Sequence, residues 1–106
     1  MASQKEKIIM SNQFGSKIRQ LREAQHLLLR QVAPHIEIDT PHLSKVERGE
    51  RQLRKDAIPT LAKLLNTDVN ELMTLWLADQ LYNVVEGEPL ADEALKTVTK
   101  NLKKLK

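Results

Sequence analysis

The sequence contains no cysteine, and it has only three glycines and three aromatic residues among its 106 positions. The absence of cysteine excludes disulfides, thiolate catalysis and cysteine-based zinc sites, and it suits a reducing compartment. Scarce glycine and aromatic residues, beside abundant Leu, Ala, Lys, Glu, Gln and Arg, are typical of an all-helical domain. A chain of this length can bury a core of its own, so we expect one all-α domain.

Long apolar runs are also missing. No stretch approaches the roughly 18 apolar residues of a membrane span, and the first residues lack the apolar segment of a signal peptide. The sequence therefore predicts a cytoplasmic protein that does not have a membrane as its partner.

Charge is distributed unevenly along the chain. Residues 1–66 carry a balance of +5 and residues 67–106 one of −2, which together give the net charge of +3. Residues 68–93 hold seven acids and no Lys or Arg. Five cations cluster within eleven residues of the first part: Lys45, Arg48, Arg51, Arg54 and Lys55. Such a local excess of positive charge suits an anionic partner.

The spacing of apolar residues and of capping residues predicts six helices. The first begins near Asn12 or Gln13, with Ser11 or Asn12 as its cap, and Asp39 is the expected cap of the third. Pro41 fits the first turn of that third helix, and Gly49 fits its end. The later helices cover about 29–35, 40–48, 55–66, 68–85 and 89–105. In the second helix, Leu28, Val32 and Ala33 or Ile36 are expected to face inward, and Asp68 and Glu71 are expected to form a capping box.

The last two predicted helices have more apolar surface than one core needs. The helix over 68–85 is apolar on two sides, and the helix over 89–105 has a short heptad pattern from Ala91 to Leu105. That pattern predicts docking on the preceding helix or on a second copy of the chain. The expected homodimer interface comprises Trp76, Leu77, Leu81, Leu95, Val98 and Leu102.

Two short helices joined by a tight turn, the second followed by basic residues, have the shape of a helix-turn-helix. From Leu29 to Leu72 the sequence aligns without a gap to the phage repressor and Cro-type (XRE-like) helix-turn-helix family, which it resembles over about 14–72. LSKVERG at 43–49 is the most specific match, supported by LAKLL at 61–65 and VNEL at 69–72. The resemblance implies a five-helix lambda-repressor-like domain over 12–72, an arm over 1–11 and a C-terminal helical extension over 73–106.

The resemblance also implies roles for single residues. Arg22 and Glu47 correspond to the structural salt bridge of the family. Base edges are expected to be contacted by Thr40, Pro41, His42, Ser44 and Lys45. Phosphates are expected to be contacted by Arg30, Gln31, Arg48, Arg51, Arg54 and Lys55.

Three positions depart from the family pattern. The second helix of the family opens with Thr or Ser followed by Gln, whereas this chain has Leu28 and Leu29. The glycine of the turn is replaced by Glu37, so either this glutamate adopts a positive φ or the turn differs slightly.

The sequence thus predicts a double-stranded DNA-binding transcriptional regulator, bacterial or phage-encoded, that binds a palindromic operator as a homodimer of the repressor or restriction-modification controller type. The alternative is an antitoxin-like protein whose C-terminal helices bind a protein partner, and RNA polymerase would be the partner of an activator. An enzyme is not expected, because His26, His35 and His42 suggest neither a metal pair nor a triad and there is no glycine-rich phosphate loop. No cofactor and no metal are expected.

Overall fold

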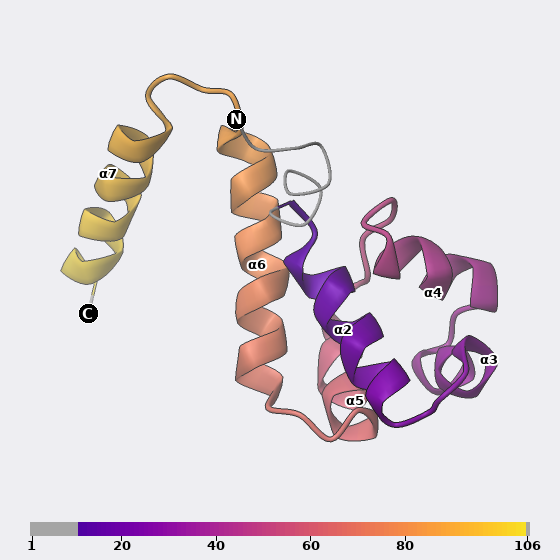
Figure 1. Ribbon diagram of the computed structural model, residues 1–106. Helices are drawn as coiled ribbons and strands as arrows, with labels where there is room; N and C mark the ends of the chain where they lie inside the picture. The colour runs from indigo at the N-terminus through magenta and orange to yellow at the C-terminus, as the bar shows by residue number, and fades with distance from the viewer. Residues whose placement is uncertain (1–10, 106) are drawn as a thin grey trace.

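The computed structural model describes residues 11–105, and within this range the chain is helical with no strand. This confirms the predicted all-α fold of a helix-turn-helix domain with an additional C-terminal helix. The predicted arm over 1–11 lies outside the described residues except for Ser11. The elements are α2 (Gln13–Ala24), α3 (Leu29–Val32), η1 (Ala33–Ile36), α4 (Thr40–Glu47), η2 (Lys55–Ala57), α5 (Ile58–Leu64), α6 (Val69–Val85) and α7 (Ala91–Lys104). Helices α2 to α6 lie together, whereas α7 stands apart on the other side of α6 (Figure 1).

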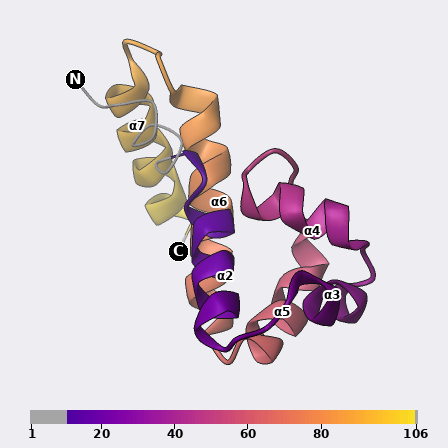
Figure 2. The same cartoon turned by 45° about the vertical axis from the view of Figure 1, so that its right-hand side comes forward.

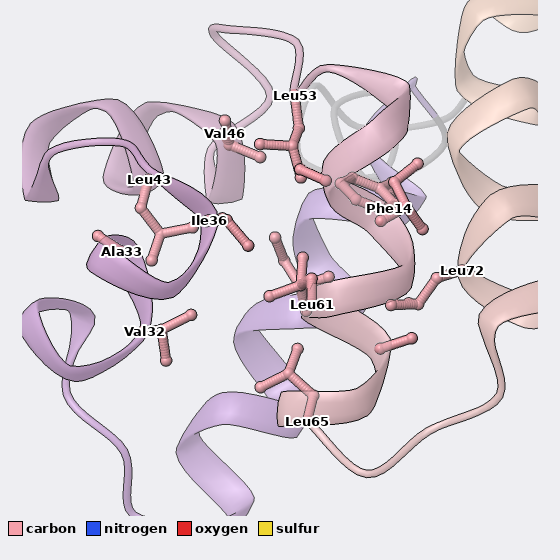
Figure 3. Close-up of a cluster of buried hydrophobic side chains, with 14 residues drawn as sticks. Phe14, Val32, Ala33, Ile36, Leu43, Val46, Leu53, Leu61, Leu65 and Leu72 are labelled. Carbon is pink, nitrogen blue, oxygen red and sulfur yellow. The ribbon is translucent and has the colours of Figure 1, made fainter.

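The core is formed by the helices that carry the helix-turn-helix and by the first part of α6. Figure 3 shows side chains from α2, η1, α4, α5 and α6 converging on one apolar centre, with Leu61 near its middle. The buried apolar residues are Phe14, Ile18, Val32, Ala33, Ile36, Leu43, Val46, Leu53, Ala57, Ile58, Leu61, Ala62, Leu65 and Leu72. They include Leu43 and Val46 of α4 and Ile58, Leu61 and Ala62 of α5.

The second predicted helix is shorter than expected. Its α-helical part ends at Val32, and the chain continues as the 3-10 turn η1 because Pro34 cannot donate a backbone hydrogen bond. Glu37 then adopts a left-handed conformation with φ of 58°, which settles the alternative left open for the turn. Leu28 was expected to face inward but is 48% exposed, because it precedes α3 as its N-cap and lies outside the helix.

The ends of α4 agree with the sequence prediction. The Asp39 carboxylate accepts a hydrogen bond from the backbone N–H of His42 at 2.8 Å, and Pro41 lies in the first turn, where its missing N–H costs little. Gly49 follows the helix with φ of 76°, a conformation that glycine adopts without strain. These signals place α4 at a defined position in the chain.

Helix α2 crosses the end of α4 at very short range. A Cβ atom on Gly15 would lie 2.4 Å from the backbone oxygen of Val46, so only glycine permits this approach. The buried Asn12 side chain donates to the backbone oxygen of Glu47 at 2.9 Å. Asn12 is the N-cap residue of α2, as predicted, but its side chain bonds to α4 and does not cap the helix.

The cap of α2 comes from α6, far along the chain. The Asp79 carboxylate accepts hydrogen bonds from the backbone N–H groups of Gln13 and Phe14, at 2.9 and 2.8 Å. A carboxylate at a helix N-terminus satisfies orphan donors and interacts favourably with the helix dipole. No local sequence pattern indicates this cap, because it joins residues more than sixty positions apart.

The start of α6 also differs from the prediction. Asp68 caps the helix by accepting from the N–H of Asn70 at 3.1 Å, but Glu71 forms an ion pair with Lys17 on α2 (3.3 Å) and no reciprocal capping bond is present among the described residues. Helix α6 is continuous through Val85, so the expected domain boundary after Leu72 falls inside one helix.

Candidate nucleic-acid interface

Helix α4 presents one face to the core and the other to solvent. Leu43 and Val46 are buried, whereas Pro41, Lys45 and Arg48 are exposed and follow one another at intervals of four and three residues. This spacing places the three exposed side chains along one ridge of the helix. Thr40 and Ser44 are half-buried beside the ridge. Figure 2 shows α4 on the side of the molecule remote from α7.

His42 differs from the other predicted base-contacting residues. It is half-buried, and its Nε2 atom is buried without a hydrogen-bond partner among the described residues. The burial of Nε2 shows that this edge of the His42 ring points into the protein and away from solvent. The expected group of five is therefore divided into four residues on or beside the ridge and one that is turned inward.

The loop after α4 continues the basic surface. Arg48 hydrogen-bonds to Glu50 and to the Ser44 hydroxyl, the latter at 3.1 Å. The side chains of Arg51 and Lys55 are exposed and form no hydrogen bond or ion pair with any residue in the range 11–105. Their charges are therefore available to an external anion.

Arg54 has a different role from its neighbours. Its Nη1 atom donates to the backbone oxygen of Ile36 at 2.9 Å, and its guanidinium forms ion pairs with Asp56 (2.9 Å) and Glu37 (3.6 Å). These contacts tie the loop to the turn between η1 and α4. Arg54 was expected to contact a phosphate, but in the structure its guanidinium is occupied by groups of the protein itself.

The orientation of α4 is held by the ion pair expected from the family resemblance. Arg22 Nε lies 2.7 Å from one carboxylate oxygen of Glu47, and Arg22 Nη2 lies 3.0 Å from the other. Both side chains are largely buried, with 11% and 5% of their surface exposed. The hydrogen bond that Arg22 donates to the Glu47 carboxylate raises the pKa of the guanidinium. Because a bidentate pair fixes both distance and angle, it holds the end of α4 against α2.

The beginning of α3 carries the two other residues expected to contact phosphates. The Gln31 side-chain oxygen accepts from the backbone N–H of Leu28 at 2.7 Å, so Gln31 supports the N-terminus of α3. The Arg30 side chain is exposed and forms no hydrogen bond or ion pair within the described part of the chain. Gln31 thus supplies one half of a capping box, whereas Leu28 has no side-chain oxygen for the other half.

Trp76 of α6 supports the basic loop from behind. Its indole Nε1 donates to the backbone oxygen of Leu53 at 2.8 Å, and its ring packs on the core. Trp76 was expected to offer a free apolar surface to a dimer, whereas in the structure its ring is half-buried against its own domain.

A cleft of about 160 Å³ lies between the loop and α6. Gln52 lines this cleft beside Arg51 and Asp79, and the sequence prediction did not include it. Only the position of Gln52 inside the basic loop could have indicated from the sequence that it lies at this surface.

Neither a metal site nor a membrane span is present in residues 11–105. No group of three or more His, Asp or Glu side chains there has the arrangement of a metal site. No helix in the same range combines the length and the apolar composition that a bilayer crossing requires.

A short helix, a turn with a left-handed residue and a second helix whose outer face is basic define the class of helix-turn-helix proteins. Residues 13–75 match the family model described as helix-turn-helix domain, and the chain belongs to this family. It is 40% identical over 58 residues to an uncharacterized HTH-type transcriptional regulator of Mycobacterium tuberculosis strain H37Rv, and equally to one of strain CDC 1551. The match covers 55% of this chain and 41% of each relative, so the chain spans about two fifths of their length.

A solved structure has a similar fold. The crystal structure of the clp gene regulator ClgR from Corynebacterium glutamicum matches with a TM-score of 0.56 at 17% identity, covering 91% of this chain and 88% of that chain. At this identity the likeness concerns the fold alone. The alignment leaves only about a tenth of either chain uncovered.

Proposed function

We propose that this chain is a transcriptional regulator of the phage repressor and Cro type, which binds double-stranded DNA with α4 in the major groove. The observation that carries the proposal is the exposed ridge of Pro41, Lys45 and Arg48 on a helix whose opposite face is buried and whose end is fixed by Arg22 and Glu47. The names of the relatives support the regulatory role.

Base reading is assigned to the ridge and the two half-buried residues beside it. Lys45 can donate to the O6 and N7 acceptors of guanine, and Thr40 and Pro41 can contact the thymine methyl group. Ser44 offers a hydroxyl, although it also accepts a hydrogen bond from Arg48 in the free protein. His42 would contribute by packing rather than by contacting a base edge.

Phosphate binding is assigned to the cations that the protein itself does not use, together with Arg48. If Arg30, Arg48, Arg51 and Lys55 each neutralise one phosphate in both half-sites, log K should fall with log salt at a slope of about −7. Removing Lys55 from both protomers should reduce the magnitude of this slope by about 2. Arg54→Ala should destabilise the fold while leaving the salt slope nearly unchanged, because its guanidinium already has three partners in the protein.

We propose a homodimer on a two-fold symmetric operator. Leu77, Leu81 and Val84 on α6 remain exposed, and so does the apolar seam of α7. A soluble monomer rarely leaves so many neighbouring apolar side chains in water. In a dimer, the two copies of α4 would lie about 34 Å apart, which is one turn of DNA.

The decisive experiment is selection of binding sites from a random duplex library, followed by salt titrations on the selected and scrambled sequences. We expect enrichment of a two-fold symmetric motif. Lys45→Ala should cost about 1 to 3 kcal/mol on the selected site and relax one base position per half-site.

The matched control is Lys63→Ala, which removes the same charge from an exposed position on α5, outside the α4 face. It should leave the selected motif unchanged. A Lys45→Ala protein that selects the same motif with the same stringency as the wild type would remove Lys45 from the base-reading residues. Failure of the wild type to enrich any motif would overturn the proposal.

A second candidate function is binding of a protein partner through α7, as in an antitoxin. The exposed seam of α7 and the acidic stretch over 68–93 favour a basic partner with an apolar groove. Copurification of a second small protein at fixed stoichiometry would support it. A pure homodimer that binds a selected operator would argue against it.

A further inference from the structure

Helix α7 is formed but unsupported in the single chain. None of its residues is buried, and it does not take part in the close packing that joins α2 to α4 and α6. Its seam residues Leu95, Val98, Leu102 and Leu105 are between 36% and 85% exposed. An isolated helix of 14 residues is marginal in water even with a favourable sequence. The helix therefore requires a surface that residues 11–105 of the same chain do not provide.

The charges of this part of the chain are separated along its length. Residues 86–93 contain four acids and no Lys or Arg, and residues 96–104 contain four lysines and no acid. The nearest opposite charges, Asp92 and Lys96, already pair within the helix at 3.0 Å, at the border between the two segments. One end of α7 is therefore acidic and the other basic.

This separation makes the helix complementary to a copy of itself in one direction only. In an antiparallel pair, the acidic end of each α7 lies beside the basic end of the other, and the two helix dipoles are opposed. In a parallel pair, like charges would meet at both ends. The apolar seam runs the length of the helix, from Ala91 to Leu105, so it is available in either direction and does not decide the orientation.

We propose that α7 pairs in antiparallel orientation with α7 of a second copy, about a two-fold axis near Thr97 and Val98. The occupant of the exposed seam is thus the same seam of the partner. This inference rests on the homodimer proposed above and specifies its interface. A seam of two heptads is short for a coiled coil, so the exposed stripe of α6 contributes to the same contact.

The test measures distances between spin labels in the dimer, and the absence of cysteine makes each label unique. Single cysteines are placed at Leu90, Thr97 and Lys104, which lie seven residues apart and on the same side, away from the seam. Neighbouring labels are then separated by about 10 Å along the helix. Antiparallel pairing predicts the shortest distance between copies at position 97. At positions 90 and 104, it predicts distances with an axial component of about 20 Å.

The outcomes separate this inference from the dimer itself. Three equal distances in a particle of dimeric mass would show parallel pairing and overturn the proposed orientation. Distances without a minimum at position 97, again at dimeric mass, would place the contact elsewhere and also overturn it. A monomeric mass with no distance between copies, on operator DNA as well, would overturn both this inference and the homodimer.

A matched pair of variants provides a second readout. Val98→Asp places a carboxylate in the seam of each copy and should raise the dimer dissociation constant at least about 100-fold. Thr97→Asp adds the same charge on the outer side of the helix and should change it less than about threefold. Because neither residue is buried in the single chain, both variants should unfold at the wild-type temperature when measured as monomers. Equal dissociation constants for the two variants would overturn the assignment of the seam.

Discussion

The two ends of α6 belong to different kinds of structure. Its first part packs on the helix-turn-helix, where Leu72 is fully buried and Trp76 is bonded to the loop after α4. Its last part exposes Leu81 and Val84, and α7 beyond it has no buried residue. Residues 12–76 therefore bury their own apolar side chains, whereas residues 77–105 carry the exposed apolar surface that the proposed dimer would cover. A mutation should affect stability in the first region and association in the second.

The largest expected difference between the two regions is in the free energy of unfolding that is lost when an ion pair is broken. Glu47→Ala leaves the Arg22 guanidinium largely buried without its main partner, and breaking such a pair should cost about 3 to 5 kcal/mol. Asp92→Ala removes the corresponding partner of Lys96 in α7, where both side chains are mostly exposed, and should cost less than about 0.5 kcal/mol. Urea unfolding followed by circular dichroism measures both values. Similar losses in the two variants would contradict the division of the chain.

Truncation of an apolar side chain in each region should give the next largest difference. Leu61 is completely buried at the centre of the core, so Leu61→Ala should destabilise the fold by about 3 kcal/mol through lost burial and a cavity. Leu102 is 58% exposed, and Leu102→Ala should leave the unfolding free energy of the monomer within about 0.5 kcal/mol. Thermal unfolding at low protein concentration makes the comparison. At high concentration, the Leu102 variant should unfold at a lower temperature than the wild type, because the proposed dimer would stabilise the wild type only under that condition.

A smaller effect on stability is expected from Asp79, through which α6 caps the start of α2. Asp79→Ala removes the acceptor of two N–H groups at the start of α2 and should cost about 1 kcal/mol. Asp79→Asn keeps one acceptor oxygen and should recover part of this loss. Amide hydrogen exchange of Gln13 and Phe14 provides the local measurement. Unchanged protection in the alanine variant would show that another group caps α2.

Apart from the Arg22–Glu47 ion pair, which was expected from the family resemblance, the features that sequence analysis predicted correctly are those determined by short stretches of chain. Asp39, Pro41 and Gly49 place α4 through local backbone chemistry, and the apolar period of α5 marks its buried face. The features that it missed depend on pairs brought together only by the fold. Arg54 looks like any exposed cation in the sequence, but the turn after η1 presents the Ile36 carbonyl to it. Trp76 follows the apolar pattern of α6, but the partner of its N–H lies in a loop twenty-three residues earlier.

The smallest expected effect on the free energy of unfolding comes from an exposed ion pair on α2, between Arg19 and Glu23. Arg19 donates to Glu23 at 2.7 Å, and this hydrogen bond, with the positive charge of Arg19, lowers the pKa of Glu23 below its ordinary value of 4.5. Because the folded pKa is lower than the unfolded one, the contribution to stability is present above the unfolded pKa and is lost as the pH falls through the folded pKa.

Glu23→Gln should therefore be slightly less stable than the wild type at pH 7, and the two proteins should become equally stable at pH values below the folded pKa. Carbon NMR titration of the Glu23 carboxyl group gives the folded pKa directly. Paired urea unfolding curves at pH 7 and at a pH below that measured pKa then give the two stabilities. In an Arg19→Gln background the loss at pH 7 should shrink to the small contribution of Arg22, whose Nη2 atom lies 3.8 Å from the same carboxylate oxygen of Glu23. If the Glu23→Gln loss at pH 7 is undiminished in that background, the Arg19–Glu23 pair is not its source.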